Sequence, residues 1–199
     1  MSSTEIFCFN KDGLCCQEYA IKNAWRGAMA VWGIMEEKYL PPYRPSYVPV
    51  EMSMQEFEQR FGFKPRRLSA TLFATEAVKK ENPAEEIWEL FEDKTIVLDD
   101  RIVLGTTFDW VLVRHDEIEK VVRAFRNFGG ETNLKEQADI LAEIVKDENI
   151  SAIGWNQTSV NADTWMNAGG PFEERERQPY NYLEQDKHWW LFDELEGKR

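Results

Sequence analysis

The spacing of hydrophobic residues changes once within the first forty positions. Apolar and β-prone residues flank Asn10–Gly13 in the stretch EIFCFNKDGLCCQEYAI, and Asp-Gly at such a break is a strong hairpin signal. From residue 20 to residue 40 the apolar side chains instead recur every three or four positions, which predicts one long helix. The expected inner stripe of this helix is Ile21, Trp25, Ala28, Trp32, Met35 and Tyr39.

A proline-rich stretch follows. Residues 41–50, PPYRPSYVPV, contain four prolines and show no helical period. Proline fixes its own φ and donates no backbone hydrogen bond, so the stretch predicts an extended surface connector. Ser53 and Glu56 then form a capping box for a short helix, and Asn82-Pro83 marks the start of another.

Strand and helix patterns alternate in the second half. Residues 95–117, TIVLDDRIVLGTTFDWVLVRHDE, predict strands with breaks at 99–100 and 105–106. Two helices are expected next, one capped by Asp116 with Glu119 and one by the capping box Asn133 with Glu136. Their expected inner residues are Ile118, Val121, Val122, Phe125, Leu134, Ala138, Leu141 and Val145. ISAIGW and KHWWLFDE are expected to be short strands.

This order of elements predicts an α+β fold. We expect residues 1–199 to form a single domain whose mainly antiparallel sheet carries helices on one face, with an N-terminal β-hairpin followed by a long helix. Residues 169–179, GGPFEERERQP, alternate in charge and predict a flexible surface loop.

Composition limits the functional classes. Aromatic residues make up 13% of the chain, which favours a folded core. The sequence has no apolar run of membrane-span length and no secretory signal pattern at its start, so we expect a cytoplasmic protein without membrane contact. The net charge of -12 repels nucleic acid and anionic membranes, and all of it arises after residue 50.

Candidate catalytic chemistry is sparse. The only histidines are His115 and His188, and the three cysteines, Cys8, Cys15 and Cys16, lie on the predicted hairpin. A zinc site needs several ligands at workable spacing, and neither phosphate-binding glycine motifs nor a GxSxG elbow occurs. We therefore expect no metal, no cofactor and no catalytic residue, and we expect the cysteines to behave as small hydrophobic residues.

The stretch GWNQTSVNADTW, residues 154–165, is unusually dense in polar side chains. Such residues hydrogen-bond their own backbone and build turns, which is one explanation. The other is a recognition loop, because binding surfaces combine tryptophan with adaptable amides and hydroxyls. The predicted binding residues are Trp155, Asn156, Gln157, Ser159, Asn161, Asp163 and Trp165.

The sequence as a whole favours an acidic binding protein. We expect it to engage the basic surface of a partner protein, in one version by mimicking nucleic acid and so inhibiting a defence-type nucleic-acid-binding enzyme. The alternatives are a small hydrolase with a pocket near Trp155–Trp165 and a structural subunit that pairs through its aromatic surface.

Overall fold

The computed structural model describes residues 3–40, 59, 83–157, 165 and 179–198. Contacts divide the chain into two units, Met1–Leu40 with Ala84–Arg199, and Pro41–Pro83. The predicted connector 41–50 and the helix cap at 53–56 lie outside the described residues, as does 169–178 of the predicted loop. None of the described helices combines the length and apolar character needed to cross a membrane.

The N-terminal hairpin is confirmed. Strand β1 spans Ser3–Asn10 and β2 spans Cys15–Lys22, paired antiparallel. Gly13 has a φ of 80° and its amide donates to the Asn10 carbonyl, while the Asn10 side chain accepts from the amides of Asp12 and Leu14. Glycine adopts this left-handed conformation without steric cost, so the Asp-Gly signal was a correct guide to the turn.

Five strands form one mixed, mostly antiparallel sheet. Strands β3 (Val111–Arg114), β4 (Ile150–Asn156) and β5 (Trp189–Trp190) join the hairpin in the order β2-β1-β4-β3-β5. Only the β3–β5 pair is parallel. Because Ser3 pairs with Lys22 and Glu5 with Asn156, the start of β1 and the ends of β2 and β4 lie at the same end of the sheet.

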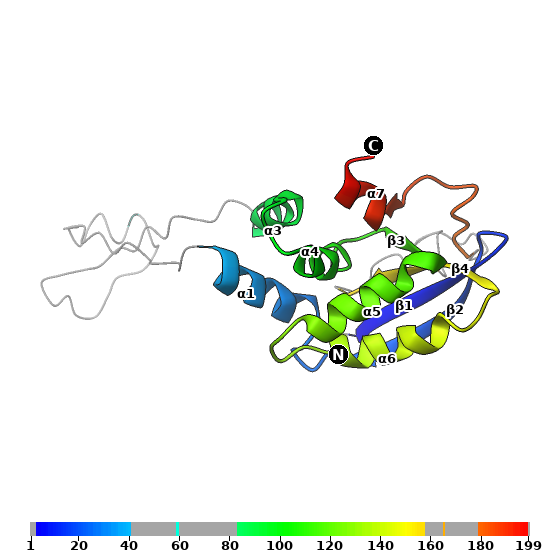
Figure 1. Cartoon of the computed structure of the whole chain (residues 1–199), viewed down its shortest axis with the longest axis horizontal. Helices are drawn as coiled ribbons and strands as arrows, with labels where there is room; N and C mark the ends of the chain where they lie inside the picture. Colours follow the sequence, from blue (N-terminus) through cyan, green and yellow to red (C-terminus); the bar gives the residue numbers. More distant parts are fainter. Residues whose placement is uncertain (1–2, 41–58, 60–82, 158–164, 166–178, 199) are drawn as a thin grey trace, which may run out of the picture. The chain divides into compact units, whose positions relative to one another are not determined.

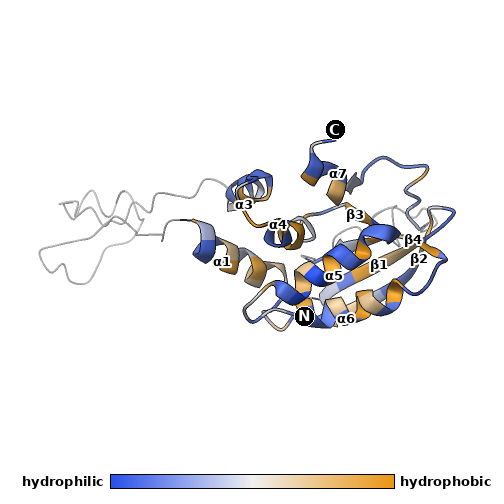
Figure 2. Cartoon of the chain, viewed as in Figure 1, coloured by the Kyte–Doolittle hydropathy of each residue, from blue (hydrophilic) through white to orange (hydrophobic). Residues whose placement is uncertain are grey.

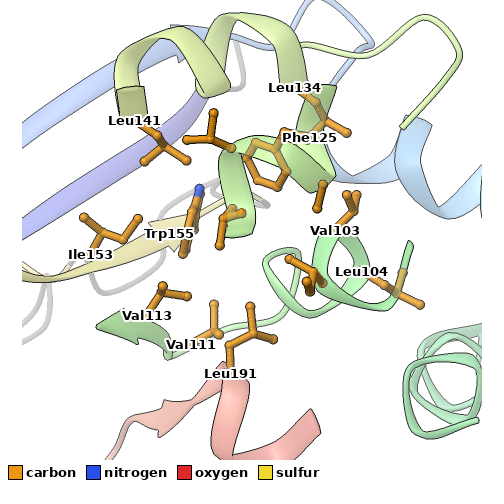
Figure 3. Packing of buried hydrophobic residues seen from close by; sticks show 14 of the residues in the cluster. Val103, Leu104, Val111, Val113, Phe125, Leu134, Leu141, Ile153, Trp155 and Leu191 are labelled. Atoms are coloured by element: carbon orange, nitrogen blue, oxygen red, sulfur yellow. The ribbon is translucent and has the colours of Figure 1, made fainter. Parts of the chain in front are cut away.

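Two helices cover one face of this sheet. Helices α5 (Ile118–Asn127) and α6 (Leu134–Ile144) lie side by side along β1 and β4 (Figure 1). Their outward sides are hydrophilic and their inward sides apolar (Figure 2). Phe125, Leu134 and Leu141 meet Val113, Ile153 and Trp155 of the sheet in the main core (Figure 3). The fold is therefore α+β, as predicted.

Side chains on the alternate strand positions form a second apolar cluster on the opposite face. Phe7, Phe9, Leu112 and Ala152 pack there with Trp165 and Tyr180. Gly154 of β4 allows this contact, because a Cβ at that position would lie 2.9 Å from Leu112 and 3.1 Å from the Trp165 ring. Aromatic side chains thus seal the face of the sheet that lies opposite α5 and α6.

The remaining described helices range from a single 3₁₀ turn to the twelve residues of α1. They are α1 (Ala28–Tyr39), α3 (Pro83–Glu92), α4 (Leu98–Gly105), the 3₁₀ turn His115–Glu117 and α7 (Leu191–Glu196). Helix α1 is tied to the end of α4 by a hydrogen bond of 2.7 Å from Trp32 Nε1 to Thr107 Oγ1. The helix predicted from Asn82-Pro83 is confirmed by α3.

Four expectations were wrong. The helix predicted from residue 20 begins only at residue 28, because β2 extends to Lys22 and a turn intervenes. Residues 98–105 form helix α4 instead of strands, since burial on both sides removes the apolar period that distinguishes the two. KHWWLFDE contributes a two-residue strand and then α7. The N-cap of α5 is Glu117 and not the predicted Asp116, and neither Glu117 nor Asn133, the N-cap of α6, makes a side-chain capping hydrogen bond.

Candidate functional site

The two tryptophans that bracket the polar stretch lie inside the protein. Trp155 is 2% exposed and Trp165 is 3% exposed. Trp155 Nε1 donates to Gln137 Oε1 at 3.1 Å, and Trp165 Nε1 donates to the Trp155 carbonyl at 3.0 Å. The structure brings the two rings to opposite faces of β4, where each completes a core cluster.

The first two amides of the stretch are also committed to the fold. Asn156 Nδ2 donates to Glu5 Oε2, and Gln157 Nε2 donates to the Thr106 carbonyl at 2.8 Å. Both residues are buried. Ser159, Asn161 and Asp163 lie outside the described residues. The binding role of the stretch stays a prediction, and those three residues are the ones on which it now depends.

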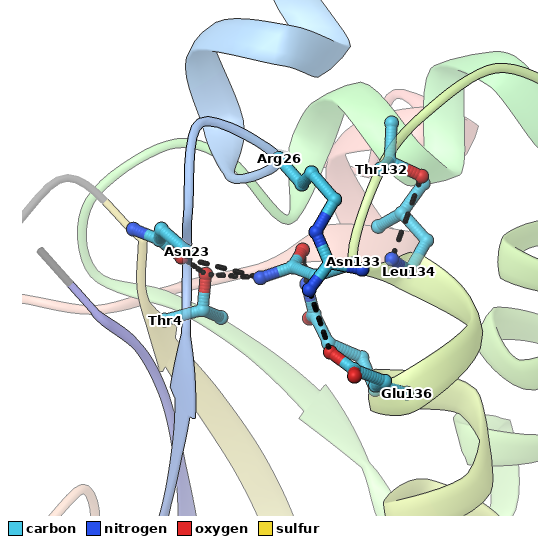
Figure 4. Close-up of polar contacts among 8 residues, drawn as sticks. Thr4, Asn23, Arg26, Thr132, Asn133, Leu134 and Glu136 are labelled. Atoms are coloured by element: carbon cyan, nitrogen blue, oxygen red, sulfur yellow. Dashed lines mark hydrogen bonds and ion pairs between the residues drawn. The ribbon is translucent and has the colours of Figure 1, made fainter.

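Trp155 is one end of a buried chain of hydrogen bonds. Gln137, which accepts from Trp155, donates through Nε2 to Asn133 Oδ1 at 2.9 Å. Asn133 Nδ2 lies 3.2 Å from both Thr4 Oγ1 and Asn23 Oδ1, and Thr4 Oγ1 donates to Asn23 Oδ1 (Figure 4). Buried amides are costly unless paired, so this chain locks β1, β4, α6 and the end of β2 together.

The chain of hydrogen bonds ends at a tight turn after β2. Arg26 N donates to the Asn23 carbonyl at 2.8 Å, and Asn133 N donates to the Arg26 carbonyl at 2.9 Å. Arg26 also pairs with Glu136 at 3.7 Å (Figure 4). A Cβ on Gly27 would lie 2.7 Å from the Asn23 side chain. The turn is therefore held from both sides and has little freedom to relax.

This turn displays a tryptophan in a strained conformation. Ala24 has a φ of 44° and Trp25 a φ of 68°, a region that bulky L-residues rarely occupy. Trp25 is nevertheless 97% exposed, and Met29 nearby is 72% exposed. The prediction that Trp25 faces the core was wrong. Neither Ala nor Trp favours a left-handed turn, so no local sequence signal marks this conformation.

Helix α3 presents a separate, acidic surface. Its ten residues, PAEEIWELFE, include four glutamates and no basic residue. Ile87, Leu90 and Phe91 face the core, whereas Glu85, Glu89 and Glu92 are exposed. Positions 85, 89 and 92 share one side of a helix. Hence α3 turns one apolar and one carboxylate-bearing side in opposite directions.

Both histidines lie near the aromatic residues of the second cluster. His188 Nδ1 lies 3.1 Å from the Tyr180 hydroxyl, and its ring packs edge-on against Tyr182 and Trp190. Burial lowers the pKa of His188 below its ordinary value. His115 lines a shallow pocket of about 400 Å³ together with Arg114, Asp116, Ser151, Tyr182 and Trp190.

Two polar side chains of that pocket, Arg114 and Ser151, already serve structural roles. Arg114 binds Asp193 through both terminal nitrogens, at 3.0 and 2.6 Å, and its guanidinium lies 4.3 Å from the centre of the Trp190 ring. Ser151 donates to the carbonyls of Phe9 and Asn10 and accepts from the Tyr182 hydroxyl. These contacts join β3 to α7 and β4 to β1.

The hairpin thiols are poor nucleophiles and poor ligands. Burial raises the pKa of Cys8 to about 12, and burial likewise raises the pKa of Cys15 and Cys16. The thiolate is the reactive and metal-binding form. Within the described parts of the chain, no three His, Cys, Asp or Glu residues are grouped so as to hold a metal ion.

Comparisons with protein families, with curated proteins and with solved structures found no match for this chain. Among the described residues, the exposed turn at Trp25 and the acidic side of α3 are two surfaces that no contact within the fold explains.

Proposed function

We propose that the protein is a non-enzymatic binding protein that engages a basic surface of a partner protein through the acidic side of α3. The observation that carries this proposal is the set of exposed carboxylates on Glu85, Glu89 and Glu92, on a helix that has no basic residue. Opposite charges across an interface speed association and select the partner. The cytoplasm is the proposed compartment.

The spacing of charge on α3 supports a more specific version. Glu85, Glu89 and Glu92 span about 10.5 Å of helix axis at 1.5 Å per residue, so the exposed side of α3 places one negative charge per ~5 Å of axis. A DNA strand carries one phosphate per ~3.4 Å of axis. The proposed partner is therefore a nucleic-acid-binding enzyme of the defence type, whose basic channel would accept α3 in place of a phosphate backbone.

The alternative of a small hydrolase near Trp155–Trp165 has less support. Both indole rings are at most 3% exposed and both indole nitrogens are satisfied within the fold. A substrate pocket between them would need space that these contacts fill. The acidic side of α3, in contrast, is open to solvent.

The test is affinity capture from a host lysate at low and high salt, followed by measurement of Kd for the protein identified. Surface charges act over ~30 Å at 0.01 M ionic strength and only ~8 Å at 0.15 M. We therefore expect a partner that binds more weakly as salt rises. The triple variant Glu85→Gln, Glu89→Gln, Glu92→Gln should raise Kd at least tenfold.

A matched control distinguishes the effect of the α3 carboxylates on Kd from the effect of total net charge. The variant Glu119→Gln, Glu148→Gln, Glu184→Gln removes the same number of charges from exposed positions elsewhere. It should change Kd much less than the α3 variant does. Equal effects of the two variants, or a partner whose affinity ignores salt, would refute the role of α3.

The polar stretch is tested separately through the residues beyond Gln157. If these side chains serve recognition and not the fold, Ser159→Ala, Asn161→Ala and Asp163→Ala together should leave the melting temperature within about 2 °C of the wild type. If the stretch contributes to recognition, the same variant should weaken partner binding. Unchanged affinity would remove these three residues from the proposed binding surface.

A further inference from the structure

Strand β2 forms one edge of the sheet, and its backbone pairs with β1 on one side. In an antiparallel pair, alternate residues direct their N–H and C=O groups away from the partner strand. Within the part of the chain that the structure describes, residues 16–22 share no backbone hydrogen bond with anything other than β1. The outer side of β2 is therefore a row of donors and acceptors that a further strand can pair with.

The outer side of β2 is long and regular. Proteins commonly protect an edge strand by making it short or by placing a proline or a bulge in it. Strand β2 has eight residues and no proline, and its register with β1 is unbroken from Gln17 to Lys22. The register shift lies at its other end, where Cys15 and Gln17 face consecutive residues of β1. Residues 17–22 thus have the geometry that an added strand requires.

The charges on β2 suit a second strand of the same sequence. Glu18 and Lys22 have opposite signs, are both exposed, and lie four residues apart on one face. This face is the one opposite α5 and α6, because Glu18 pairs with Phe7 of the second apolar cluster. Partial desolvation raises the pKa of Glu18, and the nearby Glu5 carboxylate raises it further. A cation placed beside Glu18 offsets this repulsion.

The alternate residues Tyr19 and Ile21 lie on the other face of β2, against the main core. Ile21 is 8% exposed, whereas Tyr19, nearer the middle of the strand, is only partly buried. The Tyr19 ring is therefore an incompletely covered apolar surface at the edge of the sheet. Aromatic and β-branched side chains form favourable pairs across antiparallel strands.

We propose that β2 pairs antiparallel with β2 of a second copy of this chain, about a two-fold axis at Ala20. The two five-stranded sheets then join into one continuous sheet. In this register Glu18 of each copy lies opposite Lys22 of the other, and Tyr19 lies opposite Ile21. A two-fold interface must be self-complementary, and both faces of the paired strands meet this condition.

The charges select this register. An axis at Glu18 places the two copies of that carboxylate opposite each other, and an axis at Lys22 does the same for the two amines. Like charges directly opposite destabilise a strand pair. With the axis at Ala20, both charge pairs are attractive. The net charge of -12 on each copy opposes association, so we expect a weak dimer with a Kd of about 10–100 μM, as a small interface gives.

Sedimentation velocity of two charge-reversal variants tests the proposal. Glu18→Lys and Lys22→Glu each place like charges opposite one another in a homodimer. Each variant alone should therefore dimerise at least tenfold more weakly than the wild type. In an equimolar mixture, one variant meets opposite charges on the other at both positions. The mixture has the total charge of two wild-type copies, and it should dimerise as tightly as the wild type.

Two controls separate this edge from other surfaces. Glu119→Lys and Lys94→Glu change the net charge equally at exposed positions outside β2, and they should dimerise like the wild type. The α3 triple glutamine variant should also dimerise like the wild type, so that loss of the dimer and loss of binding through α3 are distinguishable.

Disulfide trapping tests the register. In a Cys16→Ser background, which removes the exposed thiol, Ala20→Cys should form a covalent dimer upon oxidation. Residues directly opposite across antiparallel strands have Cα atoms about 4.5–5.5 Å apart, within the range of a disulfide. Glu18→Cys should not form this dimer, because its two copies lie four residues apart along the strands, or about 13 Å.

Several results would overturn the proposal. A wild type that stays monomeric at 100 μM contradicts it, as does a mixture of Glu18→Lys and Lys22→Glu that dimerises no better than either variant alone. Equal trapping of Ala20→Cys and Glu18→Cys contradicts the register. A monomer whose β2 amides become protected from exchange only when the partner captured through α3 is added would assign the edge to that partner instead.

Discussion

Two tryptophans of this protein adopt the same left-handed backbone conformation in very different surroundings. Trp110 has a φ of 60° and Trp25 a φ of 68°. The Trp110 ring packs against Trp165 and Tyr180, with ring centres 4.6 and 5.3 Å away, and Lys187 lies over it. Trp25 is 97% exposed. Packing explains the strain at Trp110, whereas the strain at Trp25 is not offset by burial of its own ring.

The two turns differ in what the strained backbone supports. At Trp110 the carbonyl also accepts from Trp189 N at 3.0 Å, so the unusual backbone helps to start β3 and to pair it with β5. At Trp25 the supporting bonds come from Asn23 and Asn133, and the ring projects away from them. The turn at Trp110 thus contributes packing contacts to the core, whereas the turn at Trp25 leaves its side chain in solvent.

The largest expected effect is the loss of the Trp110 ring. Trp110→Ala should lower the free energy of unfolding by about 3 kcal/mol, at the lower end of the range for a large aromatic residue because the ring is half-buried. The matched substitution Trp25→Ala should change it by less than about 0.5 kcal/mol. Urea denaturation of both variants measures the difference, and similar losses at the two sites would invalidate the comparison.

The next effect concerns the hydrogen bonds that hold the Trp25 turn. Gln137→Leu should lower the free energy of unfolding by about 2 kcal/mol, because it leaves Trp155 Nε1 and Asn133 Oδ1 buried without a hydrogen-bond partner. Amide exchange at Asn133, whose N–H binds the Arg26 carbonyl, should quicken. Gln17→Leu is the control, since the side-chain hydrogen bond of Gln17 to Tyr19 is exposed to solvent. Exchange at Asn133 that stays as slow as in the wild type would show that the turn does not depend on this chain.

A smaller effect isolates the backbone strain itself. Glycine avoids the cost of a left-handed L-residue, about 1 kcal/mol. The free energy of unfolding of Trp25→Gly should therefore be about 1 kcal/mol higher than that of Trp25→Ala. The free energy of unfolding of Trp110→Gly should be higher than that of Trp110→Ala by a similar amount. Thermal and urea unfolding of the four variants tests this. An alanine variant as stable as its glycine counterpart would show that the turn relaxes once the ring is removed.

The smallest expected effect is a pH dependence of the free energy of unfolding, which arises from His188 in the aromatic cluster that also contains Trp110. Burial lowers the pKa of His188, so the unfolded chain binds its proton more readily than the folded protein does. The stability that neutral His188 confers is complete above the ordinary histidine pKa of about 6.5 and declines as the pH falls through that value toward the lower folded one. The urea concentration at the unfolding midpoint should decrease when the pH is lowered from 7.5 to 5.5. His188→Asn should make this decrease smaller. If the urea midpoint of the variant changes with pH as much as that of the wild type, a group other than His188 causes the pH dependence.

The sequence predicted the fold class because its hairpin and the two amphipathic helices α5 and α6 carry clear periods. Asp12-Gly13 and the spacing of Ile118, Val121 and Phe125 were sufficient guides. Helix α4 was missed because Ile102, Val103 and Leu104 are all buried, so that no polar side reveals its period. The caps were misassigned for a different reason, since Asn133 uses its side chain to reach Thr4 and Asn23 across the sheet end.

The candidate surfaces were less accessible to sequence reasoning than the fold. The acidity was evident from composition, but its concentration on the outer side of α3 requires the burial of Ile87, Leu90 and Phe91. Trp25 fitted a helical stripe by spacing alone, and only the backbone at Ala24 and Trp25 removes it from that stripe. The acidic side of α3 and the exposure of Trp25 both depend on tertiary contacts, which local sequence patterns do not predict.

The position of β1 in the sheet has a consequence for synthesis of the chain. Strand β1 lies between β2 and β4, and Glu5 pairs with Asn156. Contacts so distant in sequence form slowly. At translation rates of about 5–20 residues per second, roughly 7–30 s pass between completion of the hairpin and arrival of β4. During that interval Ile6, Phe7 and Phe9, which are fully buried in the finished protein, border an unpaired strand edge. The nascent chain is therefore expected to need shielding from aggregation until the seventh strand residue of β4 has left the ribosome.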